Sequence, residues 1–116
     1  MLQNQVQLIG NLGADIELKE LGEKSVANFS LASNEDYKNA QGEKVAKSVW
    51  HRCTAWGKTA EILANHAKKG TKLCIKGKLI YGKYVKVVGT EEITIPTTEI
   101  LIEEFLFLGG GDKKTE

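Results

Sequence analysis

The segment 49–56 carries the residues whose types and spacing are most informative about chemistry. It reads Val-Trp-His-Arg-Cys-Thr-Ala-Trp. Side chains alternate between the two faces of a strand, so Trp50, Arg52 and Trp56 are predicted to share one face. Indole rings stack on nucleobases of any sequence, and a guanidinium beside them can contact phosphate. This face predicts a surface that binds single-stranded nucleic acid, with tryptophans packed in a protein interface as the alternative.

Basic residues are concentrated in the middle of the chain. Residues 37–86 carry a net charge of +10, whereas residues 1–36 and 87–116 are acidic, and the whole chain is at +1. Lysines that alternate with aromatic residues are typical of surfaces where cations contact phosphates and rings hold bases. Solvated lysines on strand exteriors are the alternative. The predicted phosphate contacts are Lys47, Arg52, Lys58, Lys72, Lys76, Lys78, Lys83 and Lys86, and the predicted stacking residues are Tyr37, Trp50, Trp56 and Tyr84.

The sequence offers no arrangement that is typical of an enzyme or a metal site. His51 and His66 fall on different predicted elements. The pair His51 and Cys53, with Cys74 far along the chain, matches no zinc-ligand spacing. The glycine pattern of a phosphate-binding loop is also absent. We therefore predict no catalytic residue, no metal and no cofactor.

Length and composition limit the class of protein. With 116 residues and a mass of 12.8 kDa, the chain has the length of one domain. Its 41% hydrophobic and 27% charged residues are typical of a globular protein. No apolar run approaches the ~20 residues that span a bilayer, so no membrane partner is expected. Two cysteines without C-x-x-C spacing fit a reducing cytoplasm.

The elements that must position these residues are mostly strands. Period-two alternation predicts five of them, near residues 6–12, 26–35, 47–56, 71–81 and 97–108, the last with a shift of register at Glu103-Glu104. An apolar stripe at helical spacing predicts one helix over 59–69, and residues 84–96 predict an exposed hairpin. This order favours an all-β fold, the five-stranded OB-fold, a Greek-key barrel. The domain is expected over 1–108, followed by a flexible end at 109–116.

Several stretches match, in order, those of a known family. They are N-x-V-x-L-I-G-N-L-G-x-D (4–15), VANFSLAS (26–33), WHRCTAWGKTAE (50–61), KKGTKLCIKGKL (68–79) and TTEILIEEFLFLGG (97–110). In these motifs, which cover nearly the whole chain, it resembles the bacterial single-stranded DNA-binding proteins, or SSBs. The segment that begins Trp-His-Arg is fairly specific to that family.

The resemblance implies both an architecture and a function. The family has an OB-fold that assembles as a homotetramer and wraps single-stranded DNA during replication, recombination and repair, in the cytoplasm at the nucleoid. It implies no catalysis. The family's base-stacking aromatic residues fall here on Tyr37, Trp50, Trp56 and Tyr84, and His51 falls near the family's subunit contact.

The main departures from the family pattern lie in the hairpin and at the end of the chain. Pro96 stands where the family often has an aromatic residue, and proline cannot donate a ladder hydrogen bond, which leaves the pairing of the hairpin's return arm open. The family usually continues through a linker to an acidic tip that recruits partner enzymes, whereas this sequence ends with GGGDKKTE. Either this sequence is a shortened form, or the protein binds DNA without recruiting replication and repair enzymes through such a tip.

Three other functions remain open at this point. A tail-less primosomal replication protein, which assists helicase loading, has a similar barrel and would be a dimer. A protein-interaction barrel would place the tryptophans in a protein interface. A nuclease on the same barrel would need metal-binding carboxylates on the basic face, where residues 37–86 offer only Glu43 and Glu61.

Overall fold

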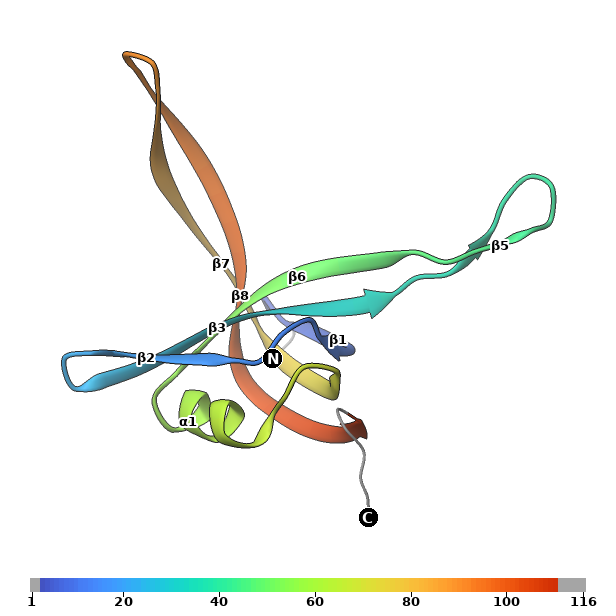
Figure 1. Cartoon of the computed structure of the whole chain (residues 1–116), viewed down its shortest axis with the longest axis horizontal. Coiled ribbons are helices and arrows are strands. Elements are labelled where there is room, and N and C mark those ends of the chain that lie inside the picture. The colour runs from blue at the N-terminus through green and yellow to red at the C-terminus, as the bar shows by residue number, and fades with distance from the viewer. Residues whose placement is uncertain (1–2, 111–116) are drawn as a thin grey trace.

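The structure of the protein is a computed structural model that describes residues 3–110. Its elements are β1 (Val6–Leu12), β2 (Glu17–Leu21), β3 (Lys24–Asn34), β4 (Tyr37–Lys38), β5 (Lys44–Val45), β6 (Ser48–Trp56), α1 (Gly57–His66), β7 (Thr71–Val88) and β8 (Glu91–Gly110). Six strands form a sheet in the order β1-β7-β8-β6-β3-β2, and pairing of β1 with β3 closes it into a barrel (Figure 1). The predicted all-β OB-fold with one short helix is confirmed.

The strands form where apolar and polar residues alternate, and the apolar side chains fill the barrel. In β3, Ala27, Phe29 and Leu31 are buried, while Asn28 and Ser30 between them are exposed. Helix α1 adds its apolar stripe to the same core. Burial of one large aliphatic side chain contributes about 1.5–3 kcal/mol, so this shared core holds sheet and helix together. Its largest fully buried side chains are Leu31, Leu63, Leu73, Ile75 and Cys53.

Two glycines let the strands come close enough to close the barrel. A Cβ at Gly10 in β1 would overlap the carbonyl group of Ala32 in β3, beside the residues through which these strands pair. A Cβ at Gly77 in β7 would overlap the carbonyl group of Leu101 in β8, next to a shift of register. Both positions therefore require a residue without a side chain.

The sheet has one more strand than the five that were predicted. All residues of β2 are exposed, so its sequence, Glu-Leu-Lys-Glu-Leu, has no buried face that would produce alternation. The helix also begins earlier than predicted, at Gly57 instead of residue 59. The φ angle of Gly57 is 63°, which lets the chain turn from β6 directly into α1.

The last strand confirms the predicted shift of register and extends beyond the predicted domain end. Lys76 of β7 faces Glu104 of β8, and the next residue, Gly77, faces Ile102, so one residue of β8 bulges out between them. Strand β8 continues to Gly110, two residues past the expected boundary at 108. Residues 111–116 of the predicted flexible end lie outside the described residues.

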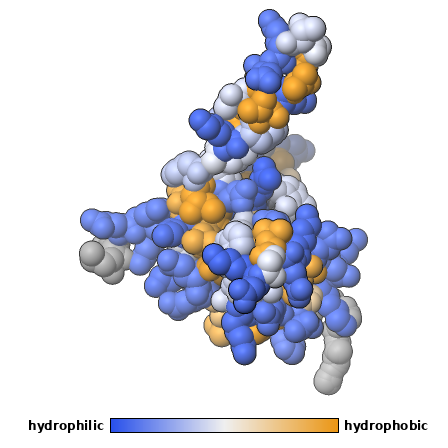
Figure 2. Space-filling view, turned by 90° about the vertical axis from the view of Figure 1, so that its left-hand side faces the viewer, coloured by the Kyte–Doolittle hydropathy of each residue, from blue (hydrophilic) through white to orange (hydrophobic). Residues whose placement is uncertain are grey.

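Three two-stranded arms extend from the barrel (Figure 1). They are the β2–β3 hairpin, the β4–β5 ribbon beyond the ends of β3 and β6, and the outer part of the β7–β8 hairpin, which turns at Gly89. In the last arm Pro96 faces Lys83 without a shift of register, so its return strand is paired throughout. Figure 2 shows apolar side chains among charged ones along this projecting arm.

Candidate nucleic-acid interface

The outer side of β3 and β6 carries the tryptophans that the sequence singled out. We call this surface the β3–β6 face; it comprises Asn28, Ser30, Trp50, Arg52 and Trp56. Trp50 lies opposite Ala32, Arg52 opposite Ser30, and Trp56 opposite Val26. Trp50 is 58% and Trp56 43% exposed, and Arg52 is exposed as well. The shared face predicted from alternation in β6 is confirmed.

Trp50 packs against the end of β1. A Cβ at Gly13 would overlap the six-membered ring of the Trp50 indole. The backbone amide of Gly13 also donates a hydrogen bond to the carbonyl of Ser30, at 3.3 Å. Gly13, Ala14 and Trp50 line an open pocket of about 380 Å³. The indole is therefore supported on one side by bare backbone, while the rest of the ring is free to stack on a flat ligand.

Trp56 stands at the other end of β6, where the strand meets α1. It lies over Val26, which is buried, and it shares an open pocket of about 370 Å³ with Lys24 and Glu61. The Ser25 hydroxyl donates a hydrogen bond to Glu61 at 3.3 Å, which ties β3 to the helix beside the ring. Trp56 follows Trp50 by six positions, so the two tryptophans stand roughly 20 Å apart along the strand.

A polar pocket of about 200 Å³ lies between the two tryptophans. Arg52 and Glu99 line it together with Asn28, Phe29, Ser30 and Cys53. The hydroxyl of Thr54, a residue buried on the same face, donates a hydrogen bond to Oε1 of Glu99. Burial, and then the nearby Glu99 carboxylate, raise the pKa of the Cys53 thiol from 9.0 to about 12. The thiol is therefore neutral and unreactive at ordinary pH.

The other predicted stacking residues lie on two of the arms. Tyr37 is on the β4–β5 ribbon, where it lines an open pocket with Lys38 and Lys44. Tyr84 is on the β7–β8 hairpin, and both rings are about half exposed. Lys86 shares one side of the hairpin with Tyr84. Lys83 is on the opposite side, since it is an odd number of residues away.

The remaining predicted phosphate contacts are distributed over the surface. Lys47 is exposed between β5 and β6, and Lys58 is exposed in the first turn of α1. Lys72, Lys76 and Lys78 all point outward from β7. Of these, Lys78 lies level with Leu101 of β8, which pairs in turn with Thr54 of β6, so Lys78 is on the side of the β3–β6 face.

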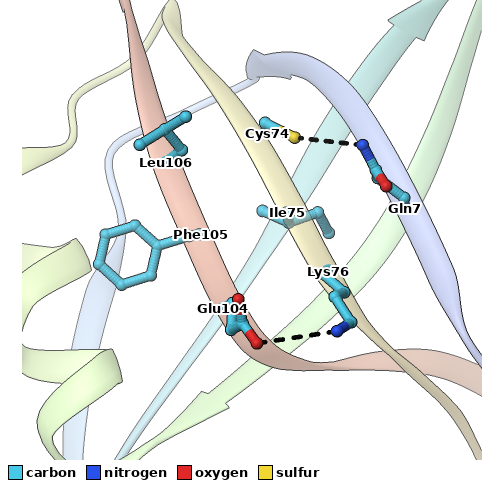
Figure 3. A pocket seen from close by; sticks show the side chains of 7 residues that line it. All are labelled: Gln7, Cys74, Ile75, Lys76, Glu104, Phe105 and Leu106. Carbon is cyan, nitrogen blue, oxygen red and sulfur yellow. Dashed lines mark hydrogen bonds and ion pairs between the residues drawn. The ribbon is translucent and has the colours of Figure 1, made fainter. Parts of the chain in front are cut away.

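Lys76 lies on a second outer surface, formed by β1, β7 and β8. We call it the β1–β7–β8 face; it comprises Gln7, Ile9, Cys74, Lys76, Glu104 and Leu106. Figure 3 shows its two cross-strand contacts: Lys76 forms an ion pair with Glu104 at 3.7 Å, and Gln7 donates a hydrogen bond to Cys74 Sγ at 3.8 Å. A shallow pocket of about 310 Å³ lies over it. The structure thus separates Lys76 from the two tryptophans.

His51 points away from the β3–β6 face, because it lies between Trp50 and Arg52 in a strand whose side chains alternate. Its Nε2 is 2.9 Å from the hydroxyl of Ser33, which fixes the ring by a hydrogen bond. Within residues 3–110 no group of three or more His, Cys, Asp or Glu side chains is arranged to hold a metal ion. In the same residues, α1 is neither long nor apolar enough to cross a membrane.

The structure also brings four residues to the candidate site that sequence reasoning did not include. Lys24 reaches Trp56 because β3 pairs with β6, and Asn28 and Glu99 line the polar pocket because β6 lies between β3 and β8. These contacts join residues far apart in the sequence, so no local pattern indicates them. Lys38 is different: it directly follows Tyr37, and that adjacency was visible in the sequence.

The chain is similar to two curated proteins named as single-stranded DNA-binding proteins. It is 44% identical over 77 residues to Single-stranded DNA-binding protein 1 of Chlorobaculum tepidum, a match that covers 66% of this chain and 48% of the relative. It is 33% identical over 116 residues to the Single-stranded DNA-binding protein of Neisseria meningitidis serogroup A, covering 99% of this chain and 65% of the relative. The chain thus spans between about half and two thirds of their length.

Among solved structures, the fold is similar to that of Plasmodium falciparum SSB in complex with ssDNA. The TM-score is 0.76 and the sequence identity 28%, over 93% of this chain and 96% of that chain. The model of the single-strand binding protein family matches residues 3–108, which include both tryptophans and the polar pocket. The protein is therefore a member of the single-strand binding protein family.

Proposed function

We propose that this protein binds and protects single-stranded DNA, with little dependence on overall sequence, in replication, recombination and repair. The observation that carries the proposal is the β3–β6 face, where two half-exposed indoles flank an exposed Arg52. Aromatic rings stack on any base, at ~1–3 kcal/mol per base, and cations attract the phosphate backbone. The names of the two curated relatives and the ssDNA complex of the P. falciparum protein support the same function.

In this proposal, different side chains contact the bases and the phosphate backbone of the DNA. Tyr37, Trp50, Trp56 and Tyr84 stack on bases, and the first and last of them extend the contact onto the arms. The predicted lysines other than Lys76, joined by Lys24 and Lys38, contact phosphates. Lys76 lies on the β1–β7–β8 face, where it is paired with Glu104. The proposal includes no catalytic step, and it keeps the cytoplasmic, nucleoid-associated localisation that the family resemblance implies.

We also propose that the chain assembles with copies of itself, as a homotetramer. The β1–β7–β8 face supports this, since Ile9 and Leu106 on it are 50% and 63% exposed, and Leu106 lines the shallow pocket. Aliphatic side chains in such a position lose contact with water when a second protein surface covers them. His51 is placed near a subunit contact in this proposal.

Titration of the intrinsic tryptophan fluorescence with oligo-dT tests the binding function. Both tryptophans are on the β3–β6 face, so stacked bases should quench their emission until the sites are saturated. Raising the salt concentration should weaken the binding, and duplex DNA, whose bases are already stacked, should not quench. If oligo-dT leaves the emission unchanged at low salt, the tryptophans serve a protein interface and the proposal fails.

A further inference from the structure

Arg52 and Glu99 bring opposite charges to the polar pocket without neutralising each other. Strand β6 runs parallel to β8, with Cys53 level with Ile100, so the preceding residues, Arg52 and Glu99, are level as well. Both line the pocket of about 200 Å³. No ion pair joins them in the part of the chain that the structure describes. A guanidinium donor and a carboxylate acceptor thus face the same space, and both are available to a ligand.

Glu99 is held in place by its neighbours. The Thr54 hydroxyl contacts both Oε1 of Glu99 and, at 3.0 Å, the side-chain amide of Asn28. Its single hydrogen can serve one acceptor, and the carboxylate is the stronger one. The Asn28 atom at 3.0 Å is Oδ1, and turning the side-chain amide by about 180° brings its NH₂ group there to donate to the hydroxyl oxygen. The second carboxylate oxygen, Oε2, has no hydrogen-bond partner within residues 3–110, so it is free to accept one.

A carboxylate is unfavourable on a surface that only attracts phosphate, because it repels the backbone. It is suited to accept a hydrogen bond from an amino group of a base, as Glu and Asp do with N4 of cytosine. The guanidinium beside it can donate to the two acceptors on the same cytosine edge, N3 and O2. Thymine presents a carbonyl in place of that amino group, and the carboxylate would repel it.

The pocket also lies on the path of a strand that stacks on both tryptophans. It is between Trp50 and Trp56, roughly 20 Å apart. At the ~3.4 Å spacing of stacked nucleotides or more, several nucleotides bridge that distance. The pocket is smaller than the ~300–1,000 Å³ of sites for drug-sized ligands, so it fits one base edge.

We propose that Glu99 and Arg52 form a base-recognition pocket that favours an unpaired cytosine over thymine at one position of the bound strand. Glu99 accepts a hydrogen bond from N4 of cytosine, and Arg52 donates to N3 and O2. Thr54 and Asn28 are positioning residues for Glu99. This inference rests on the proposed single-stranded DNA binding and adds a local base preference to it.

The test compares the affinities of (dC)8 and (dT)8, measured by tryptophan quenching at one salt concentration, for three proteins. They are the native protein, Glu99→Gln and Glu103→Gln. Glu103→Gln is the matched control, since it removes the same charge from an exposed residue outside the pocket. In Glu99→Gln the amide keeps an acceptor for Thr54, so the barrel should fold, but its NH₂ group can donate to the O4 carbonyl of thymine.

We expect Glu99→Gln to lower the affinity ratio of (dC)8 to (dT)8 by about fivefold, and Glu103→Gln to leave that ratio unchanged. If Glu99→Gln strengthens binding to both oligonucleotides by the same factor, the carboxylate acts only through its charge. The inference would then be wrong, while the proposed function stands. If neither oligonucleotide quenches the native protein, the proposed function fails, and the inference fails with it.

Discussion

The β3–β6 face and the β1–β7–β8 face are outer surfaces of one barrel, and both expose apolar side chains beside cations. They differ in the kind of apolar group. The first exposes the rings of Trp50 and Trp56, while the second exposes the aliphatic side chains of Ile9 and Leu106. An aromatic ring offers a flat π surface on which a base can stack. An aliphatic side chain contributes to the binding free energy only by losing contact with water.

The two faces also differ in how their charges are used. Lys76 on the β1–β7–β8 face is paired with Glu104, whereas Arg52 on the β3–β6 face has no ion-pair partner among residues 3–110. A paired lysine is partly neutralised before any ligand arrives, and a free guanidinium is not. In the functions proposed above, nucleic acid binds the first face and a second protein surface covers the second face, and each face can be tested separately.

The largest expected effect is on the oligomeric state, through the β1–β7–β8 face. Introducing a charge with Leu106→Glu should prevent a second surface from covering this region, since a buried unpaired carboxylate is strongly unfavourable. Light scattering should give four times the chain mass of 12.8 kDa for the native protein and a smaller multiple for the variant. Trp50→Ala should keep the native mass. A native mass for Leu106→Glu would contradict the proposed role of this face.

A smaller effect is expected on the affinity for single-stranded DNA when the β3–β6 face is altered. Trp50→Ala and Trp56→Ala should each weaken the binding of oligo-dT by ~1–3 kcal/mol, the contribution of one stacked base. Both rings are about half exposed, so their removal should leave the barrel folded, as circular dichroism can verify. Fluorescence anisotropy of a labelled oligonucleotide measures the affinity of variants that have lost a tryptophan.

Gly13→Ala serves as a control on the geometry of that face. Its Cβ would overlap the Trp50 ring, so the variant should displace the indole and lose affinity as Trp50→Ala does. In the double variant the two losses should not add, because both act through the same ring. Full additivity would show that Gly13 and Trp50 contribute independently.

The smallest expected effect is on stability at alkaline pH, and it distinguishes Cys53 from Cys74. Cys53 is buried beneath the β3–β6 face, and Cys74 lies on the β1–β7–β8 face. Because folding raises the pKa of Cys53 from 9.0 to about 12, it favours the neutral thiol. The contribution of Cys53 to stability is therefore complete below pH 9.0 and is lost as the pH rises toward about 12.

Denaturant unfolding at several pH values measures that contribution. Cys53→Ala should remove this part of the alkaline decline, whereas Cys74→Ala should retain it. A thiol reagent at neutral pH should leave Cys53 unmodified in the folded protein, and it should label Cys74 in the Leu106→Glu variant, where the β1–β7–β8 face is uncovered. Equal labelling of both cysteines would contradict the burial of Cys53.

The sequence was sufficient to predict features that follow from local alternation. Period two in β6 placed Trp50, Arg52 and Trp56 on one face, and the break in alternation at Glu103-Glu104 marked the bulge in β8. Strand β2 escaped prediction because none of its residues is buried. Alternation is informative only where one face of a strand contacts the core.

The polar pocket could not be predicted, because it depends on pairing between distant segments. Glu99 and Thr54 are 45 residues apart, and they meet only through the short parallel contact of β6 with β8. Asn28 joins them from β3 on the other side. Glu99 belongs to the acidic segment 87–116, and nothing in the local sequence indicated that it would lie beside Arg52.

The pairing of β1 with β7 has a consequence for how the chain folds. Strand β1 pairs with β7 between residues as distant as Val6 and Gly77, whereas the β2–β3 and β7–β8 hairpins pair close neighbours. Barrels dominated by distant pairs fold in milliseconds to seconds, because a long loop must close before such contacts form. During synthesis β1 emerges first and waits for β7. Throughout that interval its edge and its apolar side chains are open to other chains, so crowding of nascent chains is the condition under which this barrel is most exposed to aggregation.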